Sequence, residues 1–333
     1  MRPVPATGRS TTGAWGRYAA GMAALAVAAF VLGQDAYWLN LITVGLLFAG
    51  LASAWNIIGG FGGQFSLGHG VFFGVGAYTV ALLQARHGWS PWLSLLPAAG
   101  IATLVAAALA LPIFRLRGPF FAIGTLALNE VAFALANYFD FTGGPRGVSI
   151  PFQASLFPEP WKYAVLMFVF MAVVVAAALA IARSRLGYSL LAVREDEDAA
   201  RAAGVNPLAV KTTGLLVSAA FTGIGGGLFA LHVRFVDPPS LFELGEIGVR
   251  FPLLALIGGI GTIAGPVVGA LLVQPGALYM RGELGSLGPG GHLIVLGALL
   301  ILAAVFFKQG IVGTLAGLHL GRRLGALRGR RRR

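Results

Sequence analysis

Two apolar runs of the sequence are interrupted by side chains that could handle a polar solute or a proton. The first interruption is the segment 59–71, where six glycines surround Gln64, Ser66 and His69. Backbone amides freed by such a break must be satisfied by protein or by cavity water, because lipid offers no hydrogen bonds. The segment therefore predicts either the wall of a transport path or a tightly packed helix crossing.

The second interruption is Glu130, which follows Asn129 inside the apolar run 119–138. A carboxylate at the bilayer centre costs about 2.5–3.5 kcal/mol on insertion scales, so we expect Glu130 to face the bundle interior, to be paired or to be protonated. It could contact a solute, carry a proton or simply bond a neighbouring helix. The two interruptions together give a candidate substrate path of Gln64, Ser66, His69, Asn129 and Glu130.

The stretch 184–211 is the most highly charged internal part of the chain. It predicts one helix over about 189–203, which ends where Gly204 adopts the left-handed conformation ahead of Pro207. A charged helix with a shoulder of small residues, held between two membrane spans, has a shape suited to a groove on a soluble partner. A solvated loop helix is the alternative.

Two pairs of opposite charge in this stretch have i,i+4 spacing and would lie on one polar face. They are Arg194 with Asp198, and Glu197 with Arg201.

The sequence holds no pattern for metal binding or hydrolysis. No two of the five histidines form an H-x-x-x-H pair and cysteine is absent, so we expect no metal site. The patterns G-x-x-x-x-G-K-[ST], G-x-S-x-G and H-E-x-x-H are also absent. We therefore expect the chain to bind no cofactor and to be no enzyme.

The composition of the chain is that of a membrane protein. Of its 333 residues, 57% are hydrophobic and 11% charged, with a mean hydropathy of +0.82. A soluble domain usually carries about 25% charged residues, so a soluble globular enzyme is excluded. The expected fold class is all-α, a polytopic transmembrane helical bundle.

The net charge of +12 does not indicate nucleic-acid binding, because eight of the Lys and Arg residues lie in the tail 308–333. A basic run beside a hydrophobic span is typical of a topological anchor at the lipid surface.

We expect about ten membrane passes, including short or broken helices. Crossing a core of about 30 Å takes about 20 apolar residues. The region 251–280 is punctuated by glycines and is counted as two short passes. The other candidate spans are 18–33, 37–58, 71–84, 92–114, 119–138, 161–183, 213–233 and 292–307.

The distribution of basic residues predicts the topology. The clusters before residue 18, at Arg115 and Arg117, within 183–211 and in the tail fall on one side only if the number of passes is even. Lys and Arg in short loops mark the cytoplasmic side. We therefore expect a cytoplasmic segment 1–17, a transmembrane domain 18–307 and a cytoplasmic tail 308–333, although the first span could instead be a signal peptide.

Two glycine-rich segments are similar to each other. Residues 57–63 align with 256–262, and Gly70 then falls on Gly269 at the same offset. Transporters built from internal repeats show such pairs, but glycine-rich membrane segments also match by chance, so a duplication is a hypothesis only.

Five segments in this order carry a resemblance to a known family: GQFSLGHGVFFGVGAY, GPFFAIGTLALNE, TGGPRGVSI, REDEDAARAAGVN and GGIGTIAGPVVGA. Together they resemble the LivM-type permeases of the high-affinity branched-chain amino acid ABC importers, from about Leu46 to Gly313. Within the fourth segment, D-A-A-x-x-x-G is similar to the E-A-A-x-x-x-G loop of bacterial ABC importer permeases, with Asp198 where the pattern has Glu.

The resemblance implies a multi-pass permease subunit in a bacterial inner membrane that carries branched-chain or similar hydrophobic amino acids. ABC ATPase subunits would use the ATP, a LivH-like second permease would complete the path and a periplasmic solute-binding protein would deliver the solute. The implied ATPase-coupling residues are Arg194, Glu197, Asp198, Ala199, Ala200 and Gly204. The external loop 139–160 would contact the binding protein through Thr142, Gly143, Gly144 and Arg146, unless it is a merely structural loop.

Other functions stay open on the sequence. Similar permeases carry urea or short amides. A proton-coupled secondary transporter would use Glu130 as the proton carrier, and a scaffold or lipid-binding protein would rely on the basic tail and move no solute.

Overall fold

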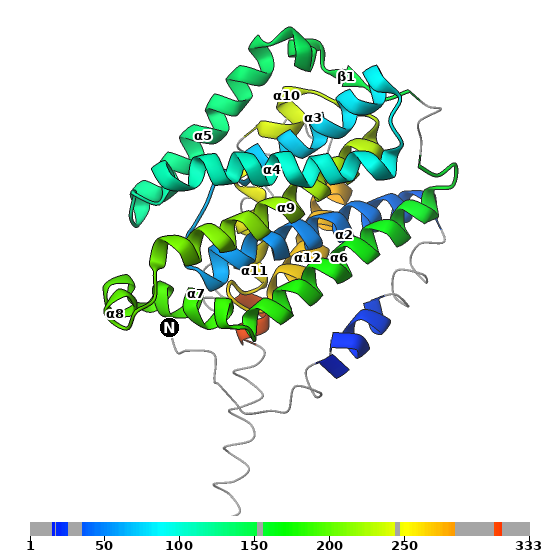
Figure 1. Ribbon diagram of the computed structural model, residues 1–333. Coiled ribbons are helices and arrows are strands. Elements are labelled where there is room, and N and C mark those ends of the chain that lie inside the picture. The colour runs from blue at the N-terminus through cyan, green and yellow to red at the C-terminus, as the bar shows by residue number, and fades with distance from the viewer. Residues whose placement is uncertain are drawn as a thin grey trace, which may run out of the picture.

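The computed structural model describes residues 15–16, 18–25, 35–151, 156–243, 247–283 and 310–314. The predicted span 292–307, most of the predicted segment 1–17 and the tail 308–333 apart from residues 310–314 lie outside these residues. The described part is almost entirely helical (Figure 1), which confirms the predicted all-α class. Its only strands are β1 (Val148–Ser149) and β2 (Phe235–Val236), which pair antiparallel.

Seven helices of the described part are 19 residues or longer: α2 (Ala36–Asn56), α3 (His69–His87), α4 (Pro91–Ile113), α5 (Pro119–Tyr138), α6 (Pro160–Ala182), α9 (Pro207–Val233) and α12 (Gly265–Glu283). The shorter ones are a π-helix (Ile57–Phe61), two 3-10 turns (Asp140–Thr142 and Gly144–Arg146), α7 (Arg185–Glu195), α8 (Glu197–Ala202), α10 (Pro238–Phe242) and α11 (Arg250–Gly258). Among the described residues, α2 with its π-helix, α4, α5, α6 and α9 are long and apolar enough to cross a membrane. The chain is thus polytopic, while the total of ten passes stays a prediction.

Prolines set the starts of four of these long helices. Pro91, Pro119, Pro160 and Pro207 each occupy the first helical position. Proline suits this position because its φ is already helical and its missing N–H would have no intrahelical partner.

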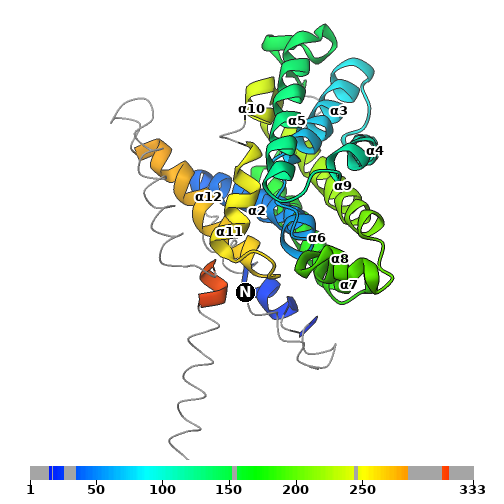
Figure 2. The same ribbon diagram turned by 90° about the vertical axis from the view of Figure 1, so that its left-hand side faces the viewer.

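The bundle is built around α2, which packs on α6, α9, α11 and α12 (Figures 1 and 2). Over its most apolar 18-residue stretch, 89% of the residues of α2 with its π-helix are buried inside the bundle, whereas the corresponding share for α5 is 22%. The helix α5 runs along the outer edge of the bundle and contacts α10 and α3. The helices α7 and α8 lie at one end of the bundle, and β1 lies at the opposite end. We call the first of these the α7–α8 end.

Glycines allow a close helix contact between α3 and α9. A Cβ on Gly76 would collide with the Gly223 carbonyl, and a Cβ on Gly226 would collide with the Phe73 carbonyl. The backbones of the two helices therefore touch, as small residues permit in membrane bundles.

The region 251–280 forms two helices, as expected. The helix α11 ends at Gly258, and α12 begins at Gly265 after a tight turn. Gly259 has φ 130° and Gly261 has φ 77°, which a side chain would resist. Both similar glycine-rich segments thus end one helix and precede another, although their common origin stays a hypothesis.

Candidate functional site

The charged connection 184–211 contains two helices instead of the one predicted. The helix α7 ends at Glu195, because Asp196 adopts an extended conformation with φ −157° and ψ 112°. Its carboxylate then caps α8 by accepting hydrogen bonds from the amides of Asp198 and Ala199, both at 2.9 Å. An Asp side chain at an N-cap position accepts hydrogen bonds from the first free amides of a new helix. This arrangement is an alternative to one continuous helix, which explains the break between α7 and α8.

An ion pair fixes α8 to the N-terminal part of α9. The Lys211 ammonium lies 2.6 Å from the Glu197 carboxylate, and the Lys211 side chain is only 3% exposed. The predicted pair between Glu197 and Arg201 is confirmed at 3.4 Å. The predicted pair between Arg194 and Asp198 is wrong: among the described ion pairs, Asp198 contacts Arg201 at 3.2 Å and Arg117 at 3.9 Å.

We expect Glu197→Gln to destabilise the protein by about 1.5–3 kcal/mol, because the buried Lys211 ammonium loses its charged partner. Asp198→Asn should cost much less, since the Asp198 side chain is 71% exposed and such pairs contribute little. Thermal unfolding in detergent measures both variants. Equal melting temperatures for the two would contradict the anchoring role of Glu197.

The small residues of the D-A-A-x-x-x-G segment, in α8 and just after it, differ in their exposure. Ala199 and Gly204 are exposed with Asp198, whereas Ala200 is only 5% exposed and packs inward. Gly204 has φ 85°, which confirms the predicted left-handed stop. The outward surface of the D-A-A-x-x-x-G segment is therefore formed by Asp198, Ala199, Gly204 and the exposed residues 201–203, and Ala200 supports it from within.

The predicted break in the segment 59–71 is present, and the chain turns back into the bundle there. The π-helix ends at Phe61, residues 62–68 are non-helical and α3 begins at His69. The Trp55 indole donates to the Ser66 carbonyl at 2.8 Å, and the Thr125 hydroxyl accepts from the Leu67 amide at 3.0 Å. Protein groups thus satisfy the freed backbone, as a break at membrane depth requires.

His69 is fully buried in a chain of hydrogen bonds. The Ser218 hydroxyl donates to the Ala54 carbonyl at 2.7 Å, so it accepts from His69 Nε2 at 2.9 Å. His69 Nδ1 then accepts from the Ser66 hydroxyl at 3.0 Å. This order requires the neutral imidazole, which joins the start of α3 to α9 through Nε2 and to the broken segment through Nδ1.

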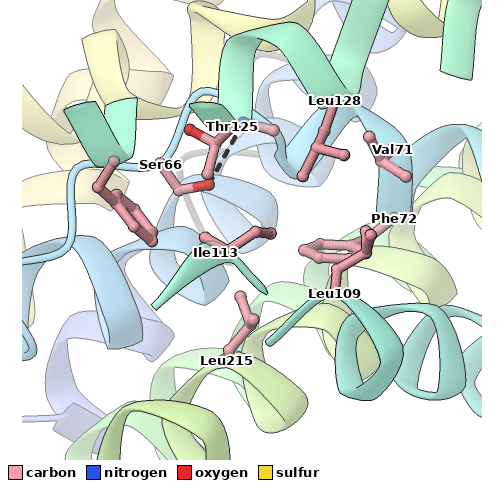
Figure 3. A pocket seen from close by; sticks show the side chains of 10 residues that line it. Ser66, Val71, Phe72, Leu109, Ile113, Thr125, Leu128 and Leu215 are labelled. Carbon is pink, nitrogen blue, oxygen red and sulfur yellow. Dashed lines mark hydrogen bonds between the residues drawn. The ribbon is translucent and has the colours of Figure 1, made fainter. Parts of the chain in front are cut away.

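A cavity and a groove border the broken segment. The first is a narrow apolar cavity, in which Ser66 and Thr125 lie on one side and Leu109 and Leu215 lie across from them (Figure 3). The second is an open groove of about 290 Å³ beside Gln64, between the broken segment and the first turn of α5.

Asn129 and Glu130 lie on different faces of α5. Asn129 is fully buried and donates to the Phe242 carbonyl. Glu130 is exposed, so the expectation that it faces the bundle interior is wrong. The inner face of α5 is taken by Phe121, Thr125 and Asn129, which repeat every four residues and leave Glu130 on the outer face.

The loop 139–160 is shaped by three of the four residues that we assigned to partner contact. The Thr142 hydroxyl donates to the Ala136 carbonyl at 2.7 Å, and Gly143 and Gly144 have φ 81° and 53°. A Cβ on Gly143 would also collide with the Gly147 carbonyl. The fourth residue, Arg146, is exposed and available to a partner.

The buried polar residues of this region that escaped the sequence analysis include Asn56, Thr125, Lys211 and Ser218. A polar residue within or beside an apolar run was the available signal for each of them. Among the described residues there is no group of three His, Cys, Asp or Glu side chains that could hold a metal ion.

The fold and these sites define a polytopic helical membrane protein with a broken, glycine-rich core and a charged helical connection at one end. The chain belongs to the family of branched-chain amino acid transport system permease components, whose family model matches residues 37–304. This confirms the resemblance stated above.

Individual relatives are similar over most of the chain. The high-affinity branched-chain amino acid transport system permease proteins LivM of Salmonella typhimurium and Escherichia coli are 30% identical over 302 residues, which cover 82% of this chain and 69% of each relative. The corresponding LivH protein of S. typhimurium is 26% identical over 299 residues, which cover 82% of this chain and 94% of LivH. No solved structure matches the chain.

Proposed function

We propose that the chain is the membrane permease subunit of an ATP-driven importer for branched-chain or similar hydrophobic amino acids. The observation that carries the proposal is the exposed D-A-A-x-x-x-G surface on α8 at one end of a polytopic bundle. It offers a soluble partner a small, capped helix on which to dock. The names of the LivM and LivH relatives support the solute class.

The partners follow from this assignment. Separate ABC ATPase subunits bind at α8 and hydrolyse ATP, so the permease itself is no enzyme and holds no cofactor. A LivH-like chain forms the other half of the path, and a periplasmic solute-binding protein docks near Arg146.

The α7–α8 end faces the cytoplasm in this proposal, with both termini on the same side. The support is the positive-inside rule: Arg115, Arg117, Arg183 and Arg185 border the same end, and Arg117 lies 3.9 Å from Asp198 on α8.

The solute path runs along the outer face of α5. Glu130 is the twelfth of the 20 residues of α5, close to the middle of the helix. Lipid tolerates an exposed carboxylate there poorly, so water or protein must cover this face. The exposed residues of α4 and α6 are instead aliphatic over the matching depth, for example Leu104 and Val169. The exposed residues of α5 around Glu130 are Phe120, Ile123, Ala127, Val131, Ala134, Leu135 and Tyr138.

We expect Glu130→Gln to lower solute uptake at least tenfold while the ATPase subunits still copurify, because the carboxylate lines the path between the two permease chains. Leu104→Gln is the control, since α4 faces lipid and its substitution should leave uptake per assembled complex unchanged. Uptake of radiolabelled leucine into vesicles measures both. Full uptake by Glu130→Gln would place the path elsewhere.

The function itself is tested in proteoliposomes that contain both permeases and the ATPase subunits, with the binding protein added. We expect leucine uptake that requires ATP and persists with an uncoupler. Uptake that an uncoupler abolishes and that ATP depletion leaves unchanged would support a proton-coupled transporter instead. Selective uptake of urea would support the ATP-driven mechanism and would show that the solute is not a branched-chain amino acid.

A further inference from the structure

The two glycine-rich breaks of the chain meet in space. Asn56, at the end of α2, accepts a hydrogen bond from the Gly261 amide at 2.8 Å and donates to the Thr262 carbonyl at 2.9 Å. Gly60 and Gly261 lie so close that a Cβ on Gly60 would be 2.8 Å from the Gly261 nitrogen. The turn between α11 and α12 is therefore held against the break between α2 and α3.

Arg194 of α7 reaches into this junction. Its Nη1 donates to the Gly60 carbonyl at 2.7 Å, across 134 residues of sequence. A Cβ on Gly63 would lie 2.7 Å from Arg194 Cγ, and a Cβ on Gly261 would lie 2.9 Å from Arg194 Nη1. One side chain thus contacts both breaks, through its aliphatic stem and through its guanidinium group.

The hydrogen bond from Arg194 gives a partner to a backbone carbonyl that the helix break leaves without one. The last carbonyls of a helix lack intrahelical partners and must find others when they are buried. The Ile58 carbonyl accepts from the Gln64 amide at 3.1 Å, and the Gly60 carbonyl accepts from Arg194. The positive charge is also favourable at the negative end of the helix dipole.

Leu190 gives α7 a second attachment one turn earlier. It is fully buried, and a Cβ on Gly62 or on Gly214 of α9 would lie 3.1 Å or 3.2 Å from its Cδ2. Leu190 and Arg194 are four residues apart, so they lie on the same face of α7. That face is fixed to the break, while α8 begins shortly after Arg194, beyond Asp196.

We propose that Arg194 is a positioning residue that transmits movement of α8 to both glycine-rich breaks at once. It acts inside the membrane domain and is not a contact with the ATPase, which revises its assignment from the sequence. The inference rests on the proposed docking of an ATPase at α8. When the docked subunit shifts α8, α7 carries the shift, and Arg194 moves the α2–α3 break and the α11–α12 turn together.

The test measures solute moved per ATP hydrolysed by the complete reconstituted complex. For Arg194→Gln we expect normal ATPase copurification, ATP hydrolysis within twofold of wild type and at least a tenfold loss of transport per ATP. Arg194→Lys keeps the charge and one donor, so it should recover part of the loss. The control Arg185→Gln lies on the same helix with an exposed side chain and should behave as wild type.

Unchanged transport per ATP in Arg194→Gln would overturn the inference, and loss of ATPase copurification would assign Arg194 to docking instead. If the variant does not fold, hydrogen exchange of the wild-type complex decides the question. ATP with vanadate should change exchange in 59–64 and in 258–264 together, and a change in one segment alone or in neither would overturn the proposal. Absence of ATP-driven uptake by the wild-type complex would instead refute the proposed function.

Discussion

Replacing Gly226 by leucine is expected to abolish the folded transmembrane domain. The position has no room for a side chain, because even a Cβ would collide with the Phe73 carbonyl of α3. Backbone cannot move aside as a flexible side chain does, so α3 and α9 would have to separate. We expect a loss of more than about 3 kcal/mol, beyond the usual cost of overpacking. Yield of monodisperse protein and its melting temperature measure the effect.

Gly100→Leu provides the matched control. Gly100 also lies within a long helix, α4, but it is exposed, and a Cβ on it would meet no other atom within 4 Å. We expect this variant to be recovered at the wild-type level. A wild-type melting temperature for Gly226→Leu would show that α3 and α9 do not touch as described.

Ala199→Arg is expected to lower ATPase copurification at least tenfold and to abolish uptake, while the permease itself stays folded. Ala199 lies on the exposed surface of α8, so a long charged side chain there obstructs a partner without disturbing the bundle. Ala200 is unsuitable for this test because it is buried, and Ala200→Arg would dislodge α8 itself. Affinity purification through a tagged permease measures the retained ATPase.

Ala199→Ser controls for the substitution, since it adds a single hydroxyl and should retain the ATPase. Normal recovery of the ATPase with Ala199→Arg would contradict docking at this surface, whatever the effect on transport.

Local chemistry made much of the fold predictable from the sequence. Long apolar runs indicated the spans, and the glycine-rich segments 59–71 and 251–280 indicated where helices are interrupted. Gly204 ahead of Pro207 indicated a left-handed helix stop, and Gly204 has φ 85°. These features depend on neighbouring residues only, and the structure has them close to the expected positions.

Features that depend on distant partners could not be predicted in the same way. Arg194 had a plausible local partner in Asp198, and nothing in the local spacing pointed to a carbonyl 134 residues away. The break at Asp196 depended on competition between a cap and helix continuation, which propensity does not decide.

The direction of Glu130 could have been found from the sequence. Phe121, Thr125 and Asn129 repeat at the spacing of one helix face, and Glu130 falls outside that repeat. The cost of a charge in lipid favours burial inside this chain, but a partner chain or a water-filled path satisfies the same physical requirement.

Accessibility of a single cysteine at the C-terminal end of α8 tests the central claim that this helix lies at the cytoplasmic face and is held by a separate ATPase. The chain has no native cysteine, so Ala203→Cys introduces a unique thiol at an exposed position. We expect a membrane-impermeant maleimide to label it in inverted vesicles only, and bound ATPase to protect it. Labelling from the periplasmic side, or labelling that the ATPase leaves unchanged, would contradict the account.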